Sequence, residues 1–144
     1  MVLRVCRAAL GSVDADDAWS ETFLSAMRGY PDLDENANVE AWLVTIAHRR
    51  IVDVVRKEAR APTPAETLPE TVSATGNPGA SDPDLWAALG ALPDKQRFAV
   101  AYHHLAGLPH ADVAELLGNS PDAARRACAD GLKALRQLYP KEEL

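Results

Sequence analysis

The chain has 144 residues, of which 47% are hydrophobic and 6% are aromatic. That length suits one ordinary domain or two small helical ones, and the composition is that of a globular protein rather than a disordered one. A formal net charge of −6 argues against a freestanding DNA-binding protein, because such proteins are usually basic.

Three helices are predicted in the first block, residues 1–60. The first of them carries an apolar stripe at helical spacing, formed by Val2, Val5, Cys6 and Ala9. Three aspartates within residues 14–17 begin the second, where the helix dipole favours negative charge. Four large side chains line one face of this second helix: Trp19, Phe23, Met27 and Tyr30. The third helix begins near Val39, after a polar loop over residues 32–38.

Positive charge is concentrated in the second half of this third helix. Its cationic residues are Arg49, Arg50, Arg56, Lys57 and Arg60. Such a helix can hold phosphates and let unpaired bases stack on neighbouring aromatic rings. Positive charge is also favoured at any helix C-terminus, so the residues alone leave open a merely solvated helix end.

The middle of the chain, residues 61–83, is predicted to be a flexible and mildly acidic linker. It contains Pro62, Pro64, Pro69, Pro78 and Pro83. Proline stops helices and restricts the residue before it, and so few large apolar groups cannot offset the entropy lost on ordering. We therefore expect an all-α protein of two small helical domains joined by this proline-rich linker.

The second block, residues 84–139, begins with two predicted helices and a turn. Apolar residues of the first helix are Leu85, Trp86, Leu89 and Leu92. Pro93 suits the first turn of the second helix, because proline is tolerated there. The turn that follows is Gly107-Leu108-Pro109.

A helix-turn-helix is predicted next. A short helix over residues 110–117 ends at Gly118, and Ser120 can cap a further helix that has Pro121 at its first position. The second helix of such a motif presents its N-terminal half to the major groove, where arginine pairs with guanine or neutralises phosphate. An ordinary helical hairpin has the same pattern, and the residues alone do not separate the two.

The remaining reactive side chains do not suggest an enzyme. Cys6 and Cys128 form no metal-ligand spacing and are expected to be free, partly buried thiols. The histidines accompany no HExxH motif, so we expect them at the surface or facing a partner. They are His48, His103, His104 and His110. No apolar run approaches the ~20 residues that span a bilayer. We expect a cytoplasmic protein that has no cofactor, no metal site and no membrane contact.

Several segments together resemble a known family. Residues 14–17 (DADD) with 21–23 (ETF) resemble the acidic DAED…QETF segment of sigma region 2. Residues 38–53 (NVEAWLVTIAHRRIVD) resemble its NxxAWLxxIAxNRxxD segment. Residues 91–97 (ALPDKQR) are similar to the ALPxxxR opening of sigma region 4, and residues 107–118 (GLPHADVAELLG) to its GLSxxEIAELLG motif. Over nearly its whole length the chain resembles the extracytoplasmic-function sigma factors of RNA polymerase, in their actinobacterial form.

This resemblance implies a role for each part of the chain. Region 2, a three-helix bundle over residues 1–60, would bind core RNA polymerase and the −10 element of promoter DNA. Region 4, over residues 84–139, would bind the −35 element. The implied polymerase-binding residues are Asp16, Asp17, Glu21 and Phe23. The implied −10 contacts are Asn38, Trp42, His48, Arg49, Arg50, Arg56, Lys57 and Arg60. The implied −35 contacts are Ser120, Asp122, Ala123, Arg125 and Arg126. Such factors are commonly held inactive by an anti-sigma factor, which is therefore a candidate partner.

The recognition helix departs from the family pattern. Ala127 and Asp130 stand where the family usually has arginines, which should weaken contacts with phosphate. Gly131 costs up to about 1 kcal/mol of helix stability relative to alanine. One alternative is therefore a degenerate sigma-like protein that binds polymerase or a regulator without reading the −35 element, and another is a helix-turn-helix repressor. Self-inhibition, with the two blocks packed together, is an alternative to control by an anti-sigma factor.

Overall fold

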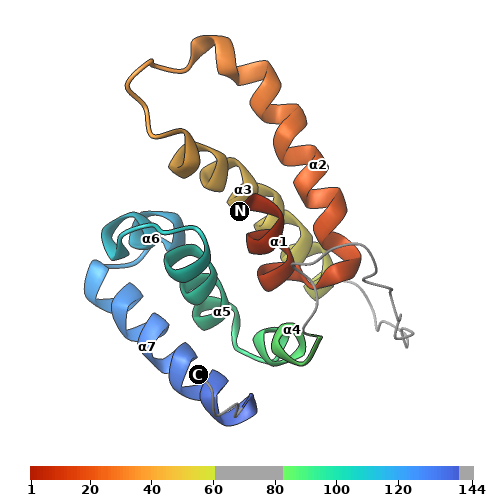
Figure 1. The fold of residues 1–144 in the computed structure, drawn as a ribbon, viewed down its shortest axis with the longest axis vertical. Helices are drawn as coiled ribbons and strands as arrows, with labels where there is room; N and C mark the ends of the chain where they lie inside the picture. Colours follow the sequence, from red (N-terminus) through yellow and green to blue (C-terminus); the bar gives the residue numbers. More distant parts are fainter. Residues whose placement is uncertain (61–82, 140–144) are drawn as a thin grey trace.

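The computed structural model describes residues 1–60 and 83–139, and all elements in these two ranges are helical (Figure 1). The first block consists of α1 (Val2–Leu10), α2 (Ser12–Gly29), the short 3₁₀ helix η1 (Tyr30–Asp32) and α3 (Val39–Arg60). The second consists of α4 (Pro83–Gly90), α5 (Asp94–Val100), the π-helical turn η3 (Ala101–Leu105), α6 (His110–Leu117) and α7 (Pro121–Leu138). The predicted all-α fold class is confirmed. The predicted linker lies outside the described residues except for Pro83, which begins α4.

Small side chains hold the first block together. The buried face of α2 is formed by Ala15, Ala18, Thr22 and Ala26. Their size lets α1 and α3 approach α2 closely, and the Thr22 hydroxyl donates a hydrogen bond to the Ala18 carbonyl at 2.7 Å, so that this buried hydroxyl is paired. Of the large side chains predicted to share a face, Phe23 is half-buried against the core, whereas Met27 is 70% exposed and Tyr30 is 63% exposed.

The predicted helix-turn-helix is present in the second block. Helix α6 has the predicted bounds, and Gly118 ends it in the left-handed conformation with a φ of 74°. The Ser120 hydroxyl accepts a hydrogen bond from the Ala123 amide at 3.1 Å and caps α7, while Pro121 occupies the first helical position. These local signals fix the angle at which α7 leaves the turn.

Gly131 has a packing role that the sequence did not reveal. A Cβ atom at this position would lie 2.8 Å from Val100 Cγ2 and 3.2 Å from the Gln96 carbonyl oxygen. The glycine is buried, and its missing side chain lets α7 pack directly against α5. The cost in helix propensity is therefore offset by close packing between the two helices.

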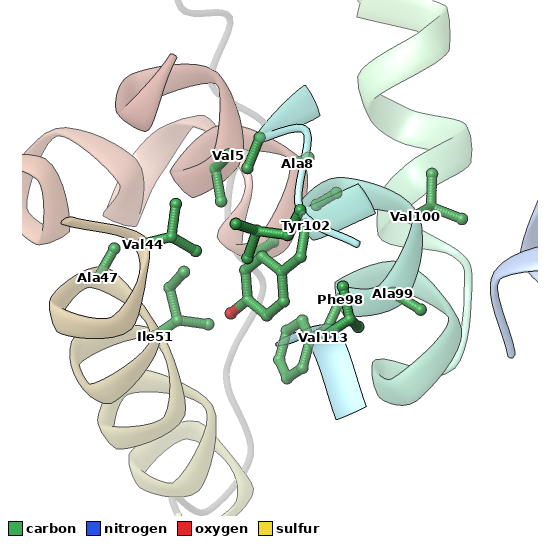
Figure 2. Close-up of a cluster of buried hydrophobic side chains, with 14 of the residues drawn as sticks. Val5, Ala8, Val44, Ala47, Ile51, Phe98, Ala99, Val100, Tyr102 and Val113 are labelled. Carbon is green, nitrogen blue, oxygen red and sulfur yellow. The ribbon is translucent and has the colours of Figure 1, made fainter. Parts of the chain in front are cut away.

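The two blocks share one hydrophobic core. Helix α1 packs against α2 and α3 on one side and against α4, α5 and η3 on the other (Figure 1). Figure 2 shows Tyr102 of η3 reaching toward α3, with its hydroxyl on the side of Val44 and Ile51. Both of those residues and Tyr102 are fully buried. The sequence had left the packed arrangement as an alternative, and the structure adopts it.

Candidate nucleic-acid interface

The cations of α3 form an exposed face on the first block. Arg49, Arg56 and Lys57 are exposed, whereas Arg50 is half-buried. The Arg50 guanidinium lies 3.7 Å from the Glu21 carboxylate and donates a long 3.5 Å hydrogen bond to the Ser25 hydroxyl. The side chain of Arg60 lies outside the described atoms. Arg49, Arg56 and Lys57 are thus accessible to phosphate, whereas Arg50 is held against α2 by Glu21 and Ser25.

A hollow of about 400 Å³ opens beside this cationic face, between α2 and α3. It is lined by Ser25, Gly29, Trp42, Ile46, Arg49, Arg50 and Asp53. The Trp42 ring lies 3.4 Å from where a Cβ atom of Gly29 would be, so the glycine lets the indole pack against the end of α2. An aromatic ring and two guanidinium groups around one hollow are chemically suited to an unstacked base and its phosphates.

The loop before α3 positions the start of that helix. The Asn38 side-chain oxygen accepts a hydrogen bond from the Ala41 amide at 3.2 Å, which caps α3. Asp34 accepts from the Asn36 amide at 3.2 Å within the loop. Tyr30 lies with its ring centroid 6.4 Å from that of Trp42. Asn38, predicted to contact DNA, therefore has a structural role as well.

His48 lies apart from the arginines. Its Nδ1 is 2.6 Å from the Tyr102 hydroxyl, across the boundary between the two blocks. Burial lowers the pKa of His48, and a backbone hydrogen bond with Leu116 partly offsets that effect. Burial raises the pKa of Tyr102, so its phenol stays protonated and donates a hydrogen bond to the neutral imidazole of His48. The Tyr102 hydroxyl thus occupies one ring nitrogen of His48, and the DNA contact of His48 stays a prediction.

The predicted polymerase-binding residues occupy two sides of α2. Asp16 and Asp17 are exposed, whereas Glu21 and Phe23 are half-buried. Glu21 faces Arg50, and the Phe23 ring packs 5.4 Å from the Trp19 ring. Glu21 lies one helical turn after Asp17 on the same face of α2, and its carboxylate reaches the Arg50 guanidinium of the cationic face.

The predicted −35 contacts lie at the start of α7. Asp122, Arg125 and Arg126 are exposed, whereas Ala123 is half-buried. The Arg125 guanidinium pairs with the Asp122 carboxylate at 2.7 Å, one helical turn earlier. The Ser120 side chain is engaged in capping. Arg125 and Arg126 thus lie at the start of α7, the end of the helix that is predicted to enter a DNA groove, and Asp122 lies beside Arg125.

The three histidines of the second block form a cluster, in which His104 is exposed and His103 and His110 are half-buried. The His103 and His110 rings stack with centroids 4.0 Å apart, and the His104 ring lies 4.8 Å from that of His103. The His103 Nδ1 is 2.8 Å from the Leu108 carbonyl oxygen. The π-helical turn brings these side chains together, because it changes the angular spacing of neighbouring residues.

Residues 1–60 and 83–139 contain neither a metal-binding cluster nor a membrane-spanning helix. Across these ranges, no three histidine, cysteine or acidic side chains are placed to hold a metal ion. No helix within them is long and apolar enough to cross a bilayer. Cys6 and Cys128 are free and buried, as predicted, and burial raises the pKa of Cys6 to about 11.

Sequence reasoning missed several residues of the hollow. Ser25, Gly29, Ile46 and Asp53 line it, although none was assigned to a site. Their spacing of four along α2 and of seven along α3 places each pair on one helix face, so the pattern held a signal. Which faces of two separate helices meet is a tertiary property, and the spacing alone did not supply it.

A cationic helix beside a hollow and a capped helix-turn-helix define a class of helical nucleic-acid-binding proteins. Similarity to known proteins identifies the family within this class. Residues 1–61 match the Sigma-70 region 2 family, and residues 83–135 match the Sigma-70 region 4 family. RNA polymerase sigma factor CarQ of Myxococcus xanthus is 31% identical over 134 residues, which cover 90% of this chain and 77% of CarQ. The ECF RNA polymerase sigma factor SigD of Mycobacterium bovis is 32% identical over 149 residues, which cover 94% and 70%.

Solved structures share the fold. The sigma factor RpoE from Bartonella quintana, in complex with the anti-sigma factor NepR, aligns with a TM-score of 0.72 at 20% identity and covers 94% of this chain and 88% of that one. CnrH, in complex with the cytosolic domain of CnrY, aligns with a TM-score of 0.62 at 21% identity and covers 95% and 79%. This chain belongs to the extracytoplasmic-function sigma factors of RNA polymerase.

Proposed function

We propose that this protein directs core RNA polymerase to promoters and assists DNA melting at the start of transcription. One observation carries the proposal: the exposed cations of α3 border a hollow that contains Trp42, in the block that matches sigma region 2. Bases released by melting stack on aromatic rings while cations hold their phosphates, so the captured strand contributes binding energy to opening. The protein acts by recognition rather than catalysis, in the cytoplasm where polymerase works.

The remaining predicted contacts are part of the same proposal. The first block, residues 1–60, docks on polymerase through the α2 surface around Asp16 and Asp17, which are exposed and negatively charged. The second block, residues 84–139, reads the −35 element through the start of α7, where Arg125 and Arg126 are exposed. The net charge of −6 disfavours DNA binding by the free protein, so promoter contact follows polymerase binding.

An anti-sigma factor is the third proposed partner. Two solved proteins with this fold, RpoE and CnrH, are in complex with partners, one of which is named an anti-sigma factor. The likeness in fold supports a similar protein partner here, beside core polymerase and promoter DNA.

The test begins with transcription by purified core polymerase and this protein on genomic DNA, followed by sequencing of the transcripts. On a promoter found in this way, Arg49→Ala, Arg50→Ala and Arg56→Ala are then combined. We expect this triple variant to lose strand opening, measured by permanganate reactivity of thymines, while it still co-purifies with core polymerase.

A matched control removes three exposed cations elsewhere: Lys95→Ala, Lys133→Ala and Arg136→Ala. This control should open the promoter as the wild type does. Equal opening by the two triple variants would refute the assignment of the α3 face. Failure of the wild-type protein to bind core polymerase would refute the proposed function itself.

A further inference from the structure

The histidine cluster, formed by His103, His104 and His110, lies where η3 meets the start of α6. The rings of His103 and His110 stack with an interplanar angle of 15° and with their centroids 4.0 Å apart. The His104 ring lies edge-on to that of His103, at 4.8 Å. His104 is exposed, and the other two are half-buried. A partner can therefore reach the cluster at the helix-turn-helix end of the second block.

Hydrogen bonding determines which ring nitrogens can bind a ligand. The Leu108 carbonyl oxygen can only accept, so His103 Nδ1, 2.8 Å away, is protonated and donates a hydrogen bond to it. Within the described residues, His110 Nδ1 is shielded from water and has no hydrogen-bond partner. Each of these two rings therefore has its Nε2 left for a ligand. In the neutral form of His103 this nitrogen is an acceptor, and it becomes a donor when the ring takes up a proton.

The stacked geometry suits an anion rather than a metal ion. Nearly parallel rings direct their lone pairs side by side, whereas the ligands of one metal ion must converge on it. Across residues 1–60 and 83–139, no three such side chains are placed to hold a metal ion. Protonated imidazoles instead present N–H donors together with positive charge, which match the oxygens of a phosphate group.

Arg125 connects the cluster to the helix that is proposed to read DNA. Burial lowers the pKa of His110, and the neighbouring histidines and Arg125 lower it further, so Arg125 lies within electrostatic reach of the ring. In a helix-turn-helix, the first helix crosses the DNA backbone while the second enters the major groove. His110 is the first residue of α6, so the cluster lies at one end of the helix that would cross the backbone, where the helix dipole also favours phosphate.

The charge of the cluster depends on what it binds. Burial lowers the pKa of His104 from 6.5, and His103 lowers it further, so His104 and His110 are neutral at pH 7 in the free protein. A phosphate group stabilises the imidazolium form, so binding would be coupled to proton uptake. This conditional positive charge lies next to a helix that has Ala127 and Asp130 where its family usually has arginine.

We propose that the histidine cluster, together with Arg125, is a binding site for the phosphate backbone of promoter DNA beside the −35 element, and that it takes up protons when it binds. The inference rests on the proposed sigma function. Because the complex holds more protons than its separate components, its affinity should increase as the pH falls. This gain should be lost as the pH rises and the imidazoles in the complex become neutral.

Other charged groups lie on the elements that pack against the cluster. They are Arg4 and Arg7 on α1, Asp94, Lys95 and Arg97 on α5, Asp112 and Glu115 on α6, and Asp122, Arg125 and Arg126 at the start of α7. A variant that replaces the histidines alone retains all of these groups. The difference between its pH profile and that of the wild type therefore isolates the cluster.

The test measures binding of a labelled promoter fragment to the holoenzyme of core polymerase and the full chain. Fluorescence anisotropy gives the affinity at pH 8 and at pH 6, at constant ionic strength. The test variant combines His103→Gln, His104→Gln and His110→Gln, whose amides form hydrogen bonds but do not titrate. Between the two pH values, the affinity of the wild type should increase about tenfold more than that of the variant, the effect expected from uptake of about one proton.

A matched control combines Lys95→Gln, Lys133→Gln and Arg136→Gln, which remove three exposed charges that do not titrate in this range. It should keep the pH dependence of the wild type.

Uncharged methylphosphonates, introduced one at a time beside the −35 element, locate the contact on the DNA. At the contacted phosphate, the substitution should abolish the additional pH dependence of the wild type and leave that of the triple histidine variant unchanged.

His104→Arg is an independent variant, because it places a permanent charge on an exposed side chain. It should bind the promoter more tightly than the wild type at pH 8 and depend less on pH. Circular dichroism shows whether the triple variant has lost its helices, in which case His104→Arg decides.

The outcomes separate the binding site from the proposed function. If the holoenzyme binds the promoter but the wild type and the triple variant have parallel pH profiles, the phosphate site is refuted and the sigma function stands. Equal affinities of His104→Arg and the wild type at pH 8 also refute the site. A wild-type chain that binds no core polymerase, or a holoenzyme that binds no promoter, refutes the proposed function itself.

Discussion

At the scale of single residues, several side chains have roles opposite to those suggested by their type. A glycine inside a helix ordinarily weakens that helix. Gly131 instead lies at a position where α5 and α7 leave no room for a Cβ atom. Asn38 was expected to contact DNA, and its side-chain oxygen accepts the hydrogen bond that caps α3. A histidine expected at the surface bonds a buried tyrosine. Each of these roles depends on a neighbour that is distant along the chain or on the exact start of a helix.

Gly131→Ala separates helix propensity from packing. Alanine would favour the α-helix by up to about 1 kcal/mol, but its methyl group would lie 2.8 Å from Val100 Cγ2. Because overpacking a close contact costs about 1–3 kcal/mol, the clash outweighs this gain, and we expect a net loss of stability of up to about 2 kcal/mol. Urea unfolding monitored by circular dichroism measures this change.

Gly90→Ala is the matched control, because a Cβ atom at Gly90 meets nothing within 4 Å. It should leave the free energy of unfolding unchanged or raise it slightly. An increase in stability on Gly131→Ala, equal to that on Gly90→Ala, would show that α5 and α7 pack less closely than the structure has them.

At the scale of elements, the start of α7 combines the arginines that are proposed to face DNA with an acid. The Asp122 carboxylate holds Arg125 at 2.7 Å and lies in the first turn, where it also stabilises the helix. Beside DNA, the same carboxylate would repel phosphate and compete for the guanidinium. Asp122 would thus compete with DNA for Arg125. In addition, α7 has Ala127 and Asp130 at positions where its family usually has arginine.

Asp122→Asn should therefore strengthen promoter binding by the complete holoenzyme. We expect about two- to fivefold tighter binding and a steeper dependence on salt, because a freed guanidinium displaces additional counterions from the DNA. Fluorescence anisotropy of a labelled promoter fragment, over a series of salt concentrations, measures both quantities. Glu115→Gln removes one exposed acid from α6 and serves as the control. Indistinguishable affinities of the two variants would argue that α7 does not face DNA.

Elements were more predictable than contacts between them. Helix α6 and the cap of α7 follow from Gly118, Ser120 and Pro121, because these signals are local in sequence. The π-helical turn at 101–105 was not predicted, since it depends on packing rather than on a sequence signal. In the candidate site, the cations were found by composition, whereas the hollow requires two helices to meet through Gly29 and Trp42. The roles of those site residues in binding DNA stay predictions.

At the scale of the whole molecule, a titratable side chain, His48, lies at the boundary between the two blocks. His48 is faced by the Tyr102 hydroxyl from η3, the Phe98 ring from α5 and the backbone of Leu116 from α6. Its pKa is lowered by burial, so the packed state favours the neutral imidazole. The stabilising contribution is complete above the ordinary pKa of 6.5 and is lost as the pH falls below that value.

Mild acid should therefore loosen the packed state. Between pH 7.5 and pH 5.5, the melting temperature of the wild type should fall further than that of His48→Gln, whose amide keeps a hydrogen-bond acceptor but does not titrate. The pKa of Glu58 is raised by its hydrogen bond with Asp14, which acts in the opposite direction, and burial lowers the pKa of His104 and His110. These groups are common to both proteins, so the difference between the two pH profiles isolates His48. Parallel profiles would contradict the assigned proton state.

The π-helical turn constrains how the chain can change in length. Between Ala101 and Ala106 the backbone hydrogen bond spans five residues rather than four, so this turn holds one residue more than an α-helical turn. Deleting one residue here would restore α-helical geometry and turn the side chains on one flank by about 100° relative to those on the other. Either Tyr102 would then no longer point toward α3, or α6 and α7 would change their orientation relative to the first block. A change of a single residue in length at this turn would thus disturb the packing on one flank or the other.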